Sequence, residues 1–384
     1  MMYQLSIKKS IFIFLLFVFS ITKKEIQAQS VQKNSIQWLN PVTDSFSFID
    51  GRAWQHHLAS PYDRLPAYAK EKVRPPLWNL SENTAGEYIE FKTAATSIIV
   101  RYTVKGNLAM PHMPATGVSG VDLYAKDSHG SWHWARGSYH FGDTIEYKFS
   151  NLSLSAAEEE WRLYLPLYNT VTWMNIGVPF ETTFRFLPIK KENCIVAYGT
   201  SILQGACASR PGLAWTNILG RKLNQTIINL GFSGNGQLEQ PIIDLMNETN
   251  ASLYILDCMP NLTMGYTFTR EEVSRRIVSS VKSLQSVHPD VPVLLTGHCG
   301  GIPGINVDTS LNHKYYEAEL LLINTFKRMK SDGFKNIFLL TASEIGFNDE
   351  LTVDGTHPND AGMMKYADAY EKVIREILKA KRKK

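Results

Sequence analysis

The stretch Cys194-Ile-Val-Ala-Tyr-Gly-Thr-Ser-Ile-Leu-Gln-Gly205 decides the fold, because a short apolar run is followed there by a glycine-containing turn and then by helix-like sequence. Short apolar runs bounded by turn residues are typical of fully buried strands. The same texture recurs in four more runs, which begin at Ile227, Leu253, Val291 and Ile337. Parallel strands joined by crossover helices produce this alternation. We therefore predict an α/β domain after Lys191.

The residues before this point have a different texture. From about residue 31 to residue 187, short stretches rich in β-branched and aromatic residues recur between turn residues, without sustained helical periodicity. The pattern predicts an antiparallel β-sandwich, with a turn or two of helix at residues 66–73. The junction at residues 188–192 is short and lacks the composition of a long linker, so we expect the two domains to pack together.

The first 28 residues have the composition of a secretory signal peptide. Two lysines precede an apolar run at residues 11–21 that is too short to span a bilayer as a helix, and Ile26-Gln-Ala28 fits a cleavage site. Lys23 and Lys24 follow the run where cleavage sites seldom carry charge, so an uncleaved anchor is the alternative. In both cases we expect export from the cytoplasm, to the periplasm or the medium.

The net charge and the cysteines indicate whether to expect a nucleic-acid partner or disulfide bonds. The formal net charge is +4, and loss of the first 28 residues, which hold four lysines and one glutamate, leaves about +1. A chain so close to neutral gives no reason to expect nucleic acid as a partner. The positions of the four cysteines indicate buried thiols, with one disulfide as an open alternative. They are Cys194, Cys207, Cys258 and Cys299.

Polar residues stand directly after the predicted strands, where open α/β sheets bind ligands. Ser201 opens a helix after the first run, and a serine at such a position, taken alone, is more often an N-cap than a nucleophile. Gly234 lies in a glycine-rich turn after the second run, where backbone amides can approach a ligand. Asn261 follows the third run as an amide donor or an ordinary turn residue. Asp354 and His357 lie three residues apart near the C-terminus.

Together these residues match the needs of serine-dependent ester chemistry. A neutral imidazole must accept the serine proton, while a carboxylate fixes its tautomer and stabilises the imidazolium that forms. We therefore predict Ser201 as the nucleophile, His357 as the general base and Asp354 as the partner of that base. The predicted reaction is hydrolysis of a carboxylic ester through an acyl-enzyme.

In this order the blocks resemble those of the SGNH (GDSL-type) hydrolase family, which supply a serine, a glycine, an asparagine and a histidine. Ser201, Gly234, Asn261 and His357 match them in turn, over roughly residues 193–380. The resemblance implies a three-layer, flavodoxin-like fold. It also implies an oxyanion hole built from the Ser201 and Gly234 backbone amides and the Asn261 side chain.

Two positions depart from the family pattern. Thr200 replaces the aspartate that usually precedes the serine, which leaves open what stabilises this loop. Asn261 lies in Asp-Cys-Met-Pro-Asn rather than in Gly-x-Asn-Asp, so its match is weaker than those of Ser201 and His357.

The arrangement of a β domain before such a hydrolase domain is similar to that of two-domain bacterial carbohydrate esterases, in which a jelly roll precedes the catalytic half. We predict a signal peptide at residues 1–28, a jelly-roll-like β-sandwich at 31–187 and the hydrolase domain at 193–380. The loop at residues 110–120 is rich in turn residues and contains a histidine, so it either reaches the active-site cleft or merely joins two strands.

Further candidate ligand-binding residues are aromatic. Trp54, Trp132 and Trp134 are sugar-stacking platforms or core residues.

The candidate metal ligands are His56, His57 and His298. They lack the spacing that is typical of a metal site, so we expect no metal, and we expect no cofactor.

The leading hypothesis is an exported serine esterase that removes acyl groups, with O-acetyl groups on polysaccharides as the expected substrate. The expected partner is therefore an acylated carbohydrate or another small ester, and the sequence leaves the oligomeric state open. A lipid acylhydrolase or thioesterase is the first alternative, and it would need a long apolar groove. A non-catalytic glycan-binding protein on a hydrolase scaffold is the second.

Overall fold

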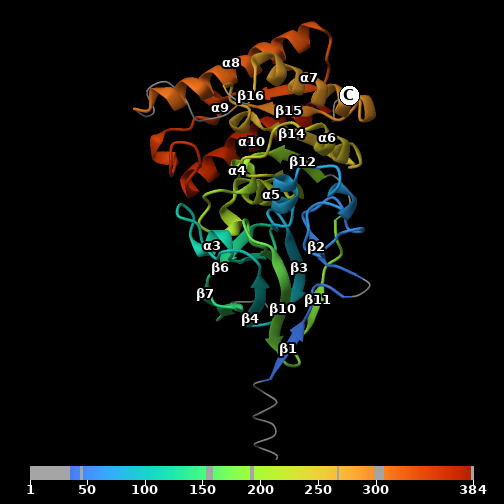
Figure 1. Cartoon of the computed structure of the whole chain (residues 1–384). Coiled ribbons are helices and arrows are strands. Elements are labelled where there is room, and N and C mark those ends of the chain that lie inside the picture. Colours follow the sequence, from blue (N-terminus) through green and yellow to red (C-terminus); the bar gives the residue numbers. More distant parts are fainter. Residues whose placement is uncertain are drawn as a thin grey trace, which may run out of the picture.

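The computed structural model describes residues 35–43, 46–152, 159–190, 194–265, 268–297 and 307–381, and it consists of two domains packed on each other (Figure 1). Antiparallel sheets come first in the chain, and a parallel sheet with helices follows. The predicted order of a β domain and an α/β domain is confirmed. The predicted signal peptide lies outside the described residues.

Two antiparallel sheets build the β domain. One has the strand order β1-β10-β4-β8-β7 and the other β11-β3-β9-β5-β6, with β2 paired to β3. The strands are β1 (Ile36–Leu39), β2 (Ile49–Asp50), β3 (Tyr88–Thr93), β4 (Ser97–Val104), β5 (Asp122–Lys126), β6 (Trp132–Ala135), β7 (Gly137–His140), β8 (Ile145–Ser150), β9 (Glu159–Tyr164), β10 (Val171–Pro179) and β11 (Phe184–Phe186).

Alternate residues of these strands face a shared core. Ile98, Val100 and Tyr102 of β4 are buried together with Phe91 of β3 and Trp161 of β9, which belong to the other sheet. This period of two places every second side chain between the sheets, as a sandwich requires. The finer prediction of a jelly-roll topology stays a prediction.

Three short helices interrupt the β domain: the 3-10 helix η1 (Ala67–Ala69), α2 (Pro75–Ser81) and α3 (Ala115–Val118). A helical turn at residues 66–73 was predicted, whereas α2 was not. Two prolines open α2, which is allowed because the first amides of a helix need no intrahelical partner. Leu77 and Trp78 of α2 pack into a core that belongs mainly to the second domain.

The second domain has one parallel sheet, ordered β13-β12-β14-β15-β16. Its strands are β12 (Cys194–Gly199), β13 (Ile227–Gly231), β14 (Ala251–Asp257), β15 (Val293–Thr296) and β16 (Ile337–Leu340). This is a doubly wound order, in which the chain starts inside the sheet and winds outward in both directions. Ligands bind such sheets beyond the carboxyl ends of the strands, near the point where the winding reverses.

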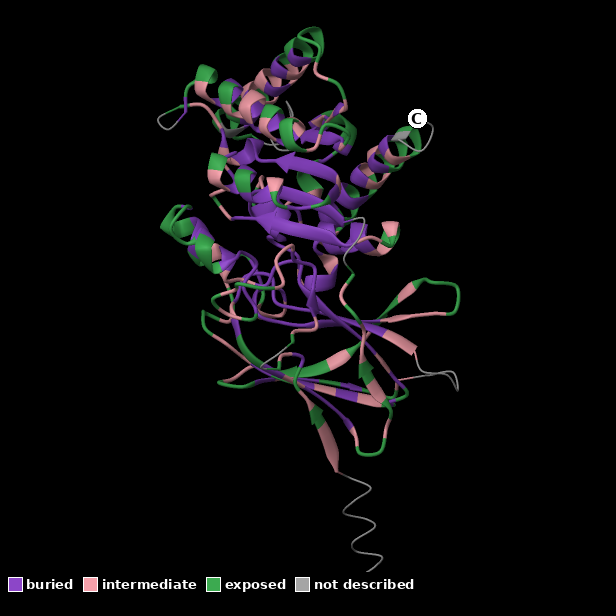
Figure 2. Ribbon diagram, turned by 90° about the vertical axis from the view of Figure 1, so that its right-hand side faces the viewer, coloured by how far each residue is buried: buried purple, intermediate pink, exposed green. Residues whose placement is uncertain are grey.

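Helices cover both faces of the sheet. Alternate residues of β12 explain why: Val196 and Tyr198 pack in one core, and Ile195 and Ala197 pack in the other. Because both faces are covered, the strands are apolar throughout, and Figure 2 shows the sheet as an almost continuously buried layer. The helices are α4 (Ser201–Gln204), α5 (Trp215–Leu223), α6 (Gln240–Asn247), α7 (Arg270–Val287), α8 (Thr309–Ser331), α9 (Ala342–Ile345) and α10 (Asp360–Lys381), with the 3-10 helices η2 (Pro211–Leu213), η3 (Met259–Asn261) and η4 (Asp349–Leu351).

Arg64 fastens the β domain to the parallel sheet. Its guanidinium is fully buried and donates to the carbonyls of Leu80 and Asn83, both at 2.7 Å, within its own domain. It also donates to the carbonyls of Asn229 and Gly231, both at 2.9 Å, at the carboxyl end of β13. Four carbonyl acceptors satisfy most of the five donors of a guanidinium, which compensates for its burial.

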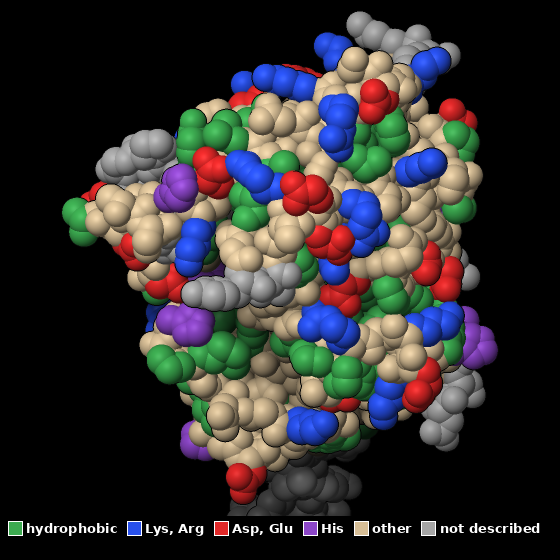
Figure 3. Space-filling model, turned by 45° about the horizontal axis from the view of Figure 1, so that its top comes forward, with side chains coloured by type: hydrophobic (Ala, Val, Ile, Leu, Met, Phe, Trp, Pro, Cys, Tyr) green, Lys and Arg blue, Asp and Glu red, His purple; other side chains and the backbone are tan. Residues whose placement is uncertain are grey.

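The three cysteines that the structure describes form no disulfide. Cys194, Cys207 and Cys258 are buried free thiols, and Cys299 lies outside the described residues. Basic and acidic side chains are interspersed over the face shown in Figure 3. Within the described ranges, no helix is both long enough and apolar enough to cross a membrane.

A buried carboxyl group lies beside the first turn of the sheet. Asp257 ends β14 next to Gly199, and its Oδ2 accepts a hydrogen bond from the Tyr370 hydroxyl at 2.9 Å. Burial raises the pKa of Asp257 to about 7, although the Tyr370 hydrogen bond acts in the opposite direction.

We expect Asp257→Asn to change the pH dependence of stability. An aspartate in the unfolded chain has a pKa of about 3.9, so between roughly pH 4 and pH 7 the folded protein holds a proton that the unfolded chain has lost. This group therefore lowers stability as the pH rises through that window and adds no further slope above it. Melting temperatures from pH 4 to pH 8 should shift in favour of the variant as the pH rises. The exposed Asp332→Asn should run parallel to wild type, and a parallel profile for Asp257→Asn would contradict the assignment.

Candidate active site

Ser201 and His357 meet at the carboxyl edge of the parallel sheet. Ser201 is the first residue of α4, and its Oγ lies 2.8 Å from Nε2 of His357, on the loop before α10. Thr200, not Ser201, is the N-cap of α4, because the Thr200 hydroxyl accepts the Ile202 amide at 3.3 Å. The interpretation of Ser201 as an N-cap is therefore wrong, and Thr200 stabilises the turn in the place of the aspartate that is usual there.

Asp354 holds the other side of the imidazole. Its Oδ2 lies 2.7 Å from Nδ1 of His357, and its Oδ1 accepts the backbone amides of Thr356 at 3.0 Å and His357 at 2.8 Å. Partial burial acts to raise the pKa of Asp354, but these hydrogen bonds and the nearby imidazole hold it well below its usual range. The carboxylate is therefore ionised at neutral pH and can stabilise an imidazolium.

The loop between Thr352 and His357 is closed on itself. The Val353 amide and the Thr352 hydroxyl both donate to the His357 carbonyl, each at 2.9 Å. Gly355 has a φ of +82°, which glycine adopts without strain. The imidazole is thus positioned by local hydrogen bonds on both sides of the turn.

Gly234 lies in the turn between β13 and α6. The Asn235 amide donates to the Phe232 carbonyl at 2.8 Å, and Gly234 has a φ of +69°. A turn with a left-handed third residue favours glycine there. The positive φ explains why the sequence has glycine at position 234. Glycine also has no side chain that could obstruct its own backbone amide.

Asn261 is linked to the Ser201 turn through Gly236. The Gly236 amide donates to Oδ1 of Asn261 at 3.1 Å, which leaves Nδ2 as the free end of that side chain. Gly236 also packs tightly on the turn, since a Cβ there would lie 2.2 Å from the Gly199 carbonyl oxygen. Contacts therefore join Ser201, His357 and Asp354 directly and bring Asn261 close through one glycine.

The β domain also reaches this site. The ring of His112 lies with its centroid 5.9 Å from that of His357, at an interplanar angle of 36°. The loop that carries His112 is anchored on the second domain, because the Thr116 hydroxyl donates to the Ser209 carbonyl at 2.7 Å. The loop therefore does more than join two strands, because it places His112 beside His357.

Sequence reasoning missed Gln204 and Tyr168. The Tyr168 hydroxyl, from the β domain, donates to the Ser201 carbonyl at 3.1 Å. The Gln204 amide group donates to the Leu167 carbonyl at 3.3 Å and accepts the Ser233 amide at 3.0 Å. Gln204 thus ties α4 to both neighbouring loops. Its position three residues after Ser201 was the only available signal.

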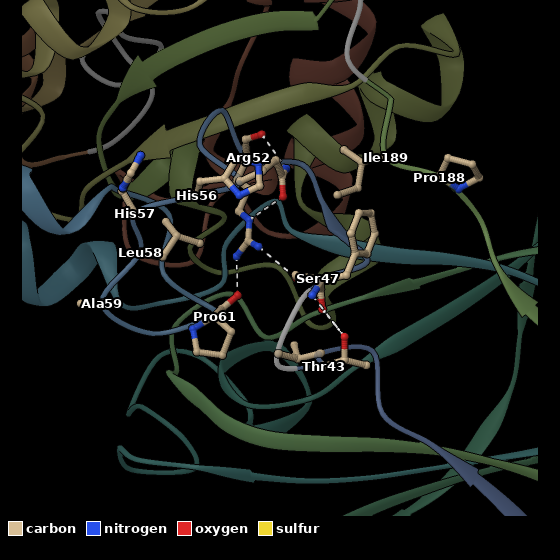
Figure 4. Close-up of a pocket in the computed structure, with 13 residues that line it drawn as sticks. Thr43, Ser47, Arg52, His56, His57, Leu58, Ala59, Pro61, Pro188 and Ile189 are labelled. Atoms are coloured by element: carbon tan, nitrogen blue, oxygen red, sulfur yellow. Dashed lines mark hydrogen bonds between the residues drawn. The ribbon is translucent and has the colours of Figure 1, made fainter.

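A separate cavity of about 520 Å³ lies in the β domain and contains none of the residues above (Figure 4). Arg52 projects into it and donates to the Pro61 carbonyl, the Ser47 hydroxyl and the Gln55 side chain. These donors are already used within the protein, so no ligand follows from the cavity. His56 and His57 line it; the described residues include no cluster of three potential metal ligands, and His298 lies outside the described ranges.

Comparison with known proteins gives the family. A model of the GDSL-like lipase/acylhydrolase family matches residues 192–375, and a model of the GxDLY domain, the N-terminus of SGNH-hydrolase-type esterases, matches residues 36–184. A solved structure described as a GDSL-like lipase from Bacteroides ovatus is 30% identical over 90% of this chain and 98% of that chain, with a TM-score of 0.80. The chain belongs to the GDSL-like lipase/acylhydrolase family.

Two further structures are similar to this esterase in fold. The salicylyl-acyltransferase SsfX3 from a tetracycline biosynthetic pathway is 16% identical with a TM-score of 0.68. A family two carbohydrate esterase from Cellvibrio japonicus is 13% identical with a TM-score of 0.52. Each covers 90% of this chain and 98% of its own. No curated protein matched. The predicted SGNH resemblance is confirmed, and the protein is a serine esterase of the GDSL type.

The letters of the GxDLY domain correspond to Gly120-Val-Asp-Leu-Tyr124 in this GDSL-type esterase. The Asp122 carboxylate pairs with Arg210 and accepts the Gly212 amide at 2.9 Å. The Tyr124 hydroxyl accepts a second hydrogen bond from Arg210, at 2.7 Å. The motif therefore fastens the β domain to the loop before η2, close to the anchor of the His112 loop.

We expect His112→Ala to weaken substrate binding more than turnover. The exposed ring of His112 borders His357 but forms no hydrogen bond with Ser201 or Asp354, so its loss should raise KM for a short-chain aryl ester about three- to tenfold and change kcat less than about threefold. Steady-state kinetics measures both. His129→Ala, an exposed histidine in another loop, is the matched control. Kinetics equal to those of the control would show that His112 does not border the bound ester.

Proposed function

We propose that this esterase cleaves acyl esters with Ser201 as the nucleophile, His357 as the general base and Asp354 as the carboxylate that orients the base. The observation that carries the proposal is the continuous contact from Ser201 Oγ to His357 Nε2 at 2.8 Å and from His357 Nδ1 to Asp354 Oδ2 at 2.7 Å. Both distances are within the range of hydrogen bonds, and the first is short enough for His357 to take the Ser201 proton.

The reaction proceeds in two halves. In the first, Nε2 of His357 takes the Ser201 proton as Oγ bonds to the ester carbonyl carbon, and the resulting imidazolium is stabilised by the Asp354 carboxylate. Collapse of the tetrahedral intermediate breaks the ester bond, and His357 returns the proton to the departing alcohol. In the second half, water attacks the acyl-Ser201 ester by the same route and releases the acid.

The developing oxyanion is stabilised by the Ser201 and Gly234 backbone amides and by Nδ2 of Asn261. Three features support this set. The Ser201 amide has no intrahelical acceptor because it lies in the first turn of α4. The Gly234 turn follows the neighbouring strand β13. The Asn261 amide is oriented through its Oδ1 by Gly236, which leaves the donor end available.

The proposed substrate is an O-acetylated polysaccharide outside the cytoplasm. The two-domain arrangement is shared with the Cellvibrio japonicus carbohydrate esterase over 90% of this chain, and the β domain, with its predicted jelly-roll topology, contributes His112 to the site. Export would depend on the signal peptide at residues 1–28. A lipid or thioester substrate would instead require a long apolar groove for the acyl chain.

We expect Ser201→Ala to abolish hydrolysis. The mature protein and the variant are incubated with 4-nitrophenyl esters from acetate to decanoate and with acetylated polysaccharides, and the released acid is measured. Wild type should favour acetate and release it from at least one polysaccharide, while the variant should lose about 10³-fold or more of the rate. Equal release by both proteins would refute the esterase mechanism, and a preference for decanoate would favour a lipid acylhydrolase.

We expect His357→Ala to lose as much activity as Ser201→Ala, because the members of a triad act as one unit. Asp354→Asn should also cost about 10³-fold or more, since an amide cannot stabilise the imidazolium and favours the wrong tautomer. Asp368→Asn, at an exposed position of α10, is the matched control and should retain wild-type rates. A fall of less than about tenfold in His357→Ala would point to another base.

A further inference from the structure

A second cavity lies where the His112 loop, the strands β6 and β7 and the second domain meet. Its volume is about 440 Å³. Most of its lining comes from the β domain, including Trp134 and Tyr139, while Ser209 and Arg210 come from the second domain. It shares no lining residue with the cavity around Arg52.

Two exposed aromatic rings form the walls of this cavity. Trp134 is 48% exposed and Tyr139 is 56% exposed. The Trp134 ring is nevertheless fixed, because its Nε1 donates to Asp122 at 2.6 Å and the Arg210 guanidinium lies 4.5 Å from its centroid. The Tyr139 ring packs on the buried Tyr147, with centroids 5.3 Å apart. Held in place at the surface, these rings are preorganised to receive a flat, partly apolar ligand.

The other candidate tryptophans are engaged within the protein. Trp132 is partly buried beneath the Arg162 guanidinium, whose centre lies 4.4 Å from its ring. Trp54 is also partly buried, and its Nε1 donates to Glu248 across the domain boundary at 3.1 Å. Of the three tryptophans singled out in the sequence, Trp134 lines this cavity.

Polar groups stand around the rings. The hydroxyls of Thr116 and Ser209 donate to protein acceptors and keep lone pairs free to accept from a ligand. Arg136 adds an exposed guanidinium to the lining, and the charge of Arg210 is balanced by Asp122. Apolar ring faces with hydroxyl and guanidinium groups at their edges suit a sugar ring, which has apolar C–H faces and a polar rim. An acyl chain would gain little beside these charged groups and would remove water from them.

The cavity is connected to the active site along two segments. Thr116, which lines it, follows His112 by four residues, a reach of at most about 14 Å of extended chain. Ser209, which also lines it, binds the Asp360 carboxylate through its amide at 2.8 Å and its hydroxyl at 2.6 Å. Asp360 follows His357 by three residues. A ligand longer than one sugar ring can therefore occupy the cavity and extend toward Ser201.

We propose that this cavity is a saccharide-binding subsite, in which a sugar ring of a polysaccharide substrate stacks on Trp134 and Tyr139 while an acylated unit of the same chain lies at Ser201. This proposal deepens the proposed function. Only the placement of an acylated unit at Ser201 rests on that function. Binding of an unacylated polysaccharide in the cavity requires no catalysis.

The test separates binding from chemistry. Trp134→Ala and Tyr139→Ala are compared with wild type and with Trp38→Ala, which removes a tryptophan of similar exposure (37%) from β1, at the far end of the β domain (Figure 1). Hydrolysis of 4-nitrophenyl acetate and of acetylated polysaccharides is measured. Binding of the deacetylated polysaccharides is measured by calorimetry in the Ser201→Ala background. Melting temperatures report folding, and Tyr139→Ala serves as the second variant if Trp134→Ala is unstable.

We expect both cavity variants to keep the aryl acetate rate within about twofold of wild type, and to lose about tenfold or more in kcat/KM on the polysaccharide, chiefly through KM. Polysaccharide affinity in the Ser201→Ala background should fall by a similar factor, and Trp38→Ala should change neither value. Unchanged polysaccharide affinity in both cavity variants would overturn the subsite. Loss of aryl acetate and polysaccharide activity in equal measure would overturn it as well. A wild-type protein that binds the polysaccharide through Trp134 but releases no acid would support the subsite and refute the esterase mechanism.

Discussion

The buried guanidinium of Arg64 is the constraint on which the rest of the structure depends. It binds two carbonyls of the β domain and two at the end of β13, directly before the turn that contains Gly234. Burial lowers the pKa of Arg64 to about 10, with Glu87 acting against this, so the group stays cationic at neutral pH. A hydrogen bond to a charged group typically contributes about 1.5–3 kcal/mol to stability. The domain boundary therefore acts as part of the active-site scaffold rather than as a connection between independent units.

Much of the catalytic half was predictable because its signals are local. The apolar run before Ser201 predicted β12, and the three-residue spacing of Asp354 and His357 predicted their pairing, since both depend on neighbours in sequence. Thr200 as the cap was missed because a serine beside it is an equally good N-cap. The helix α2 was missed because its first residues are prolines and its apolar face packs on another domain.

The residues that complete the site from the β domain could not be predicted in the same way. Tyr168 reaches the Ser201 carbonyl from 33 residues away, and His112 stands beside His357 across most of the chain. No periodicity or spacing encodes such contacts, because they arise only where the two domains pack on each other. The sequence indicated the loop of His112 through its turn residues but could not indicate which partner it would meet. The family match over residues 36–184 and 192–375 places both halves in proteins of one type, consistent with a site to which both contribute.

The core that the two domains share limits how the chain can evolve by recombination and how it unfolds. Leu65, Ala69, Leu77 and Trp78, all from the β half of the chain, are buried in the same cluster as Val196, Tyr198 and Leu230 of the parallel sheet. Separating the two halves would expose both sets of side chains to water. The hydrolase half is therefore not a freely transferable module, because recombination that exchanged it alone would also have to replace the side chains of the shared core. For the same reason, the two halves should lose their structure in one cooperative transition.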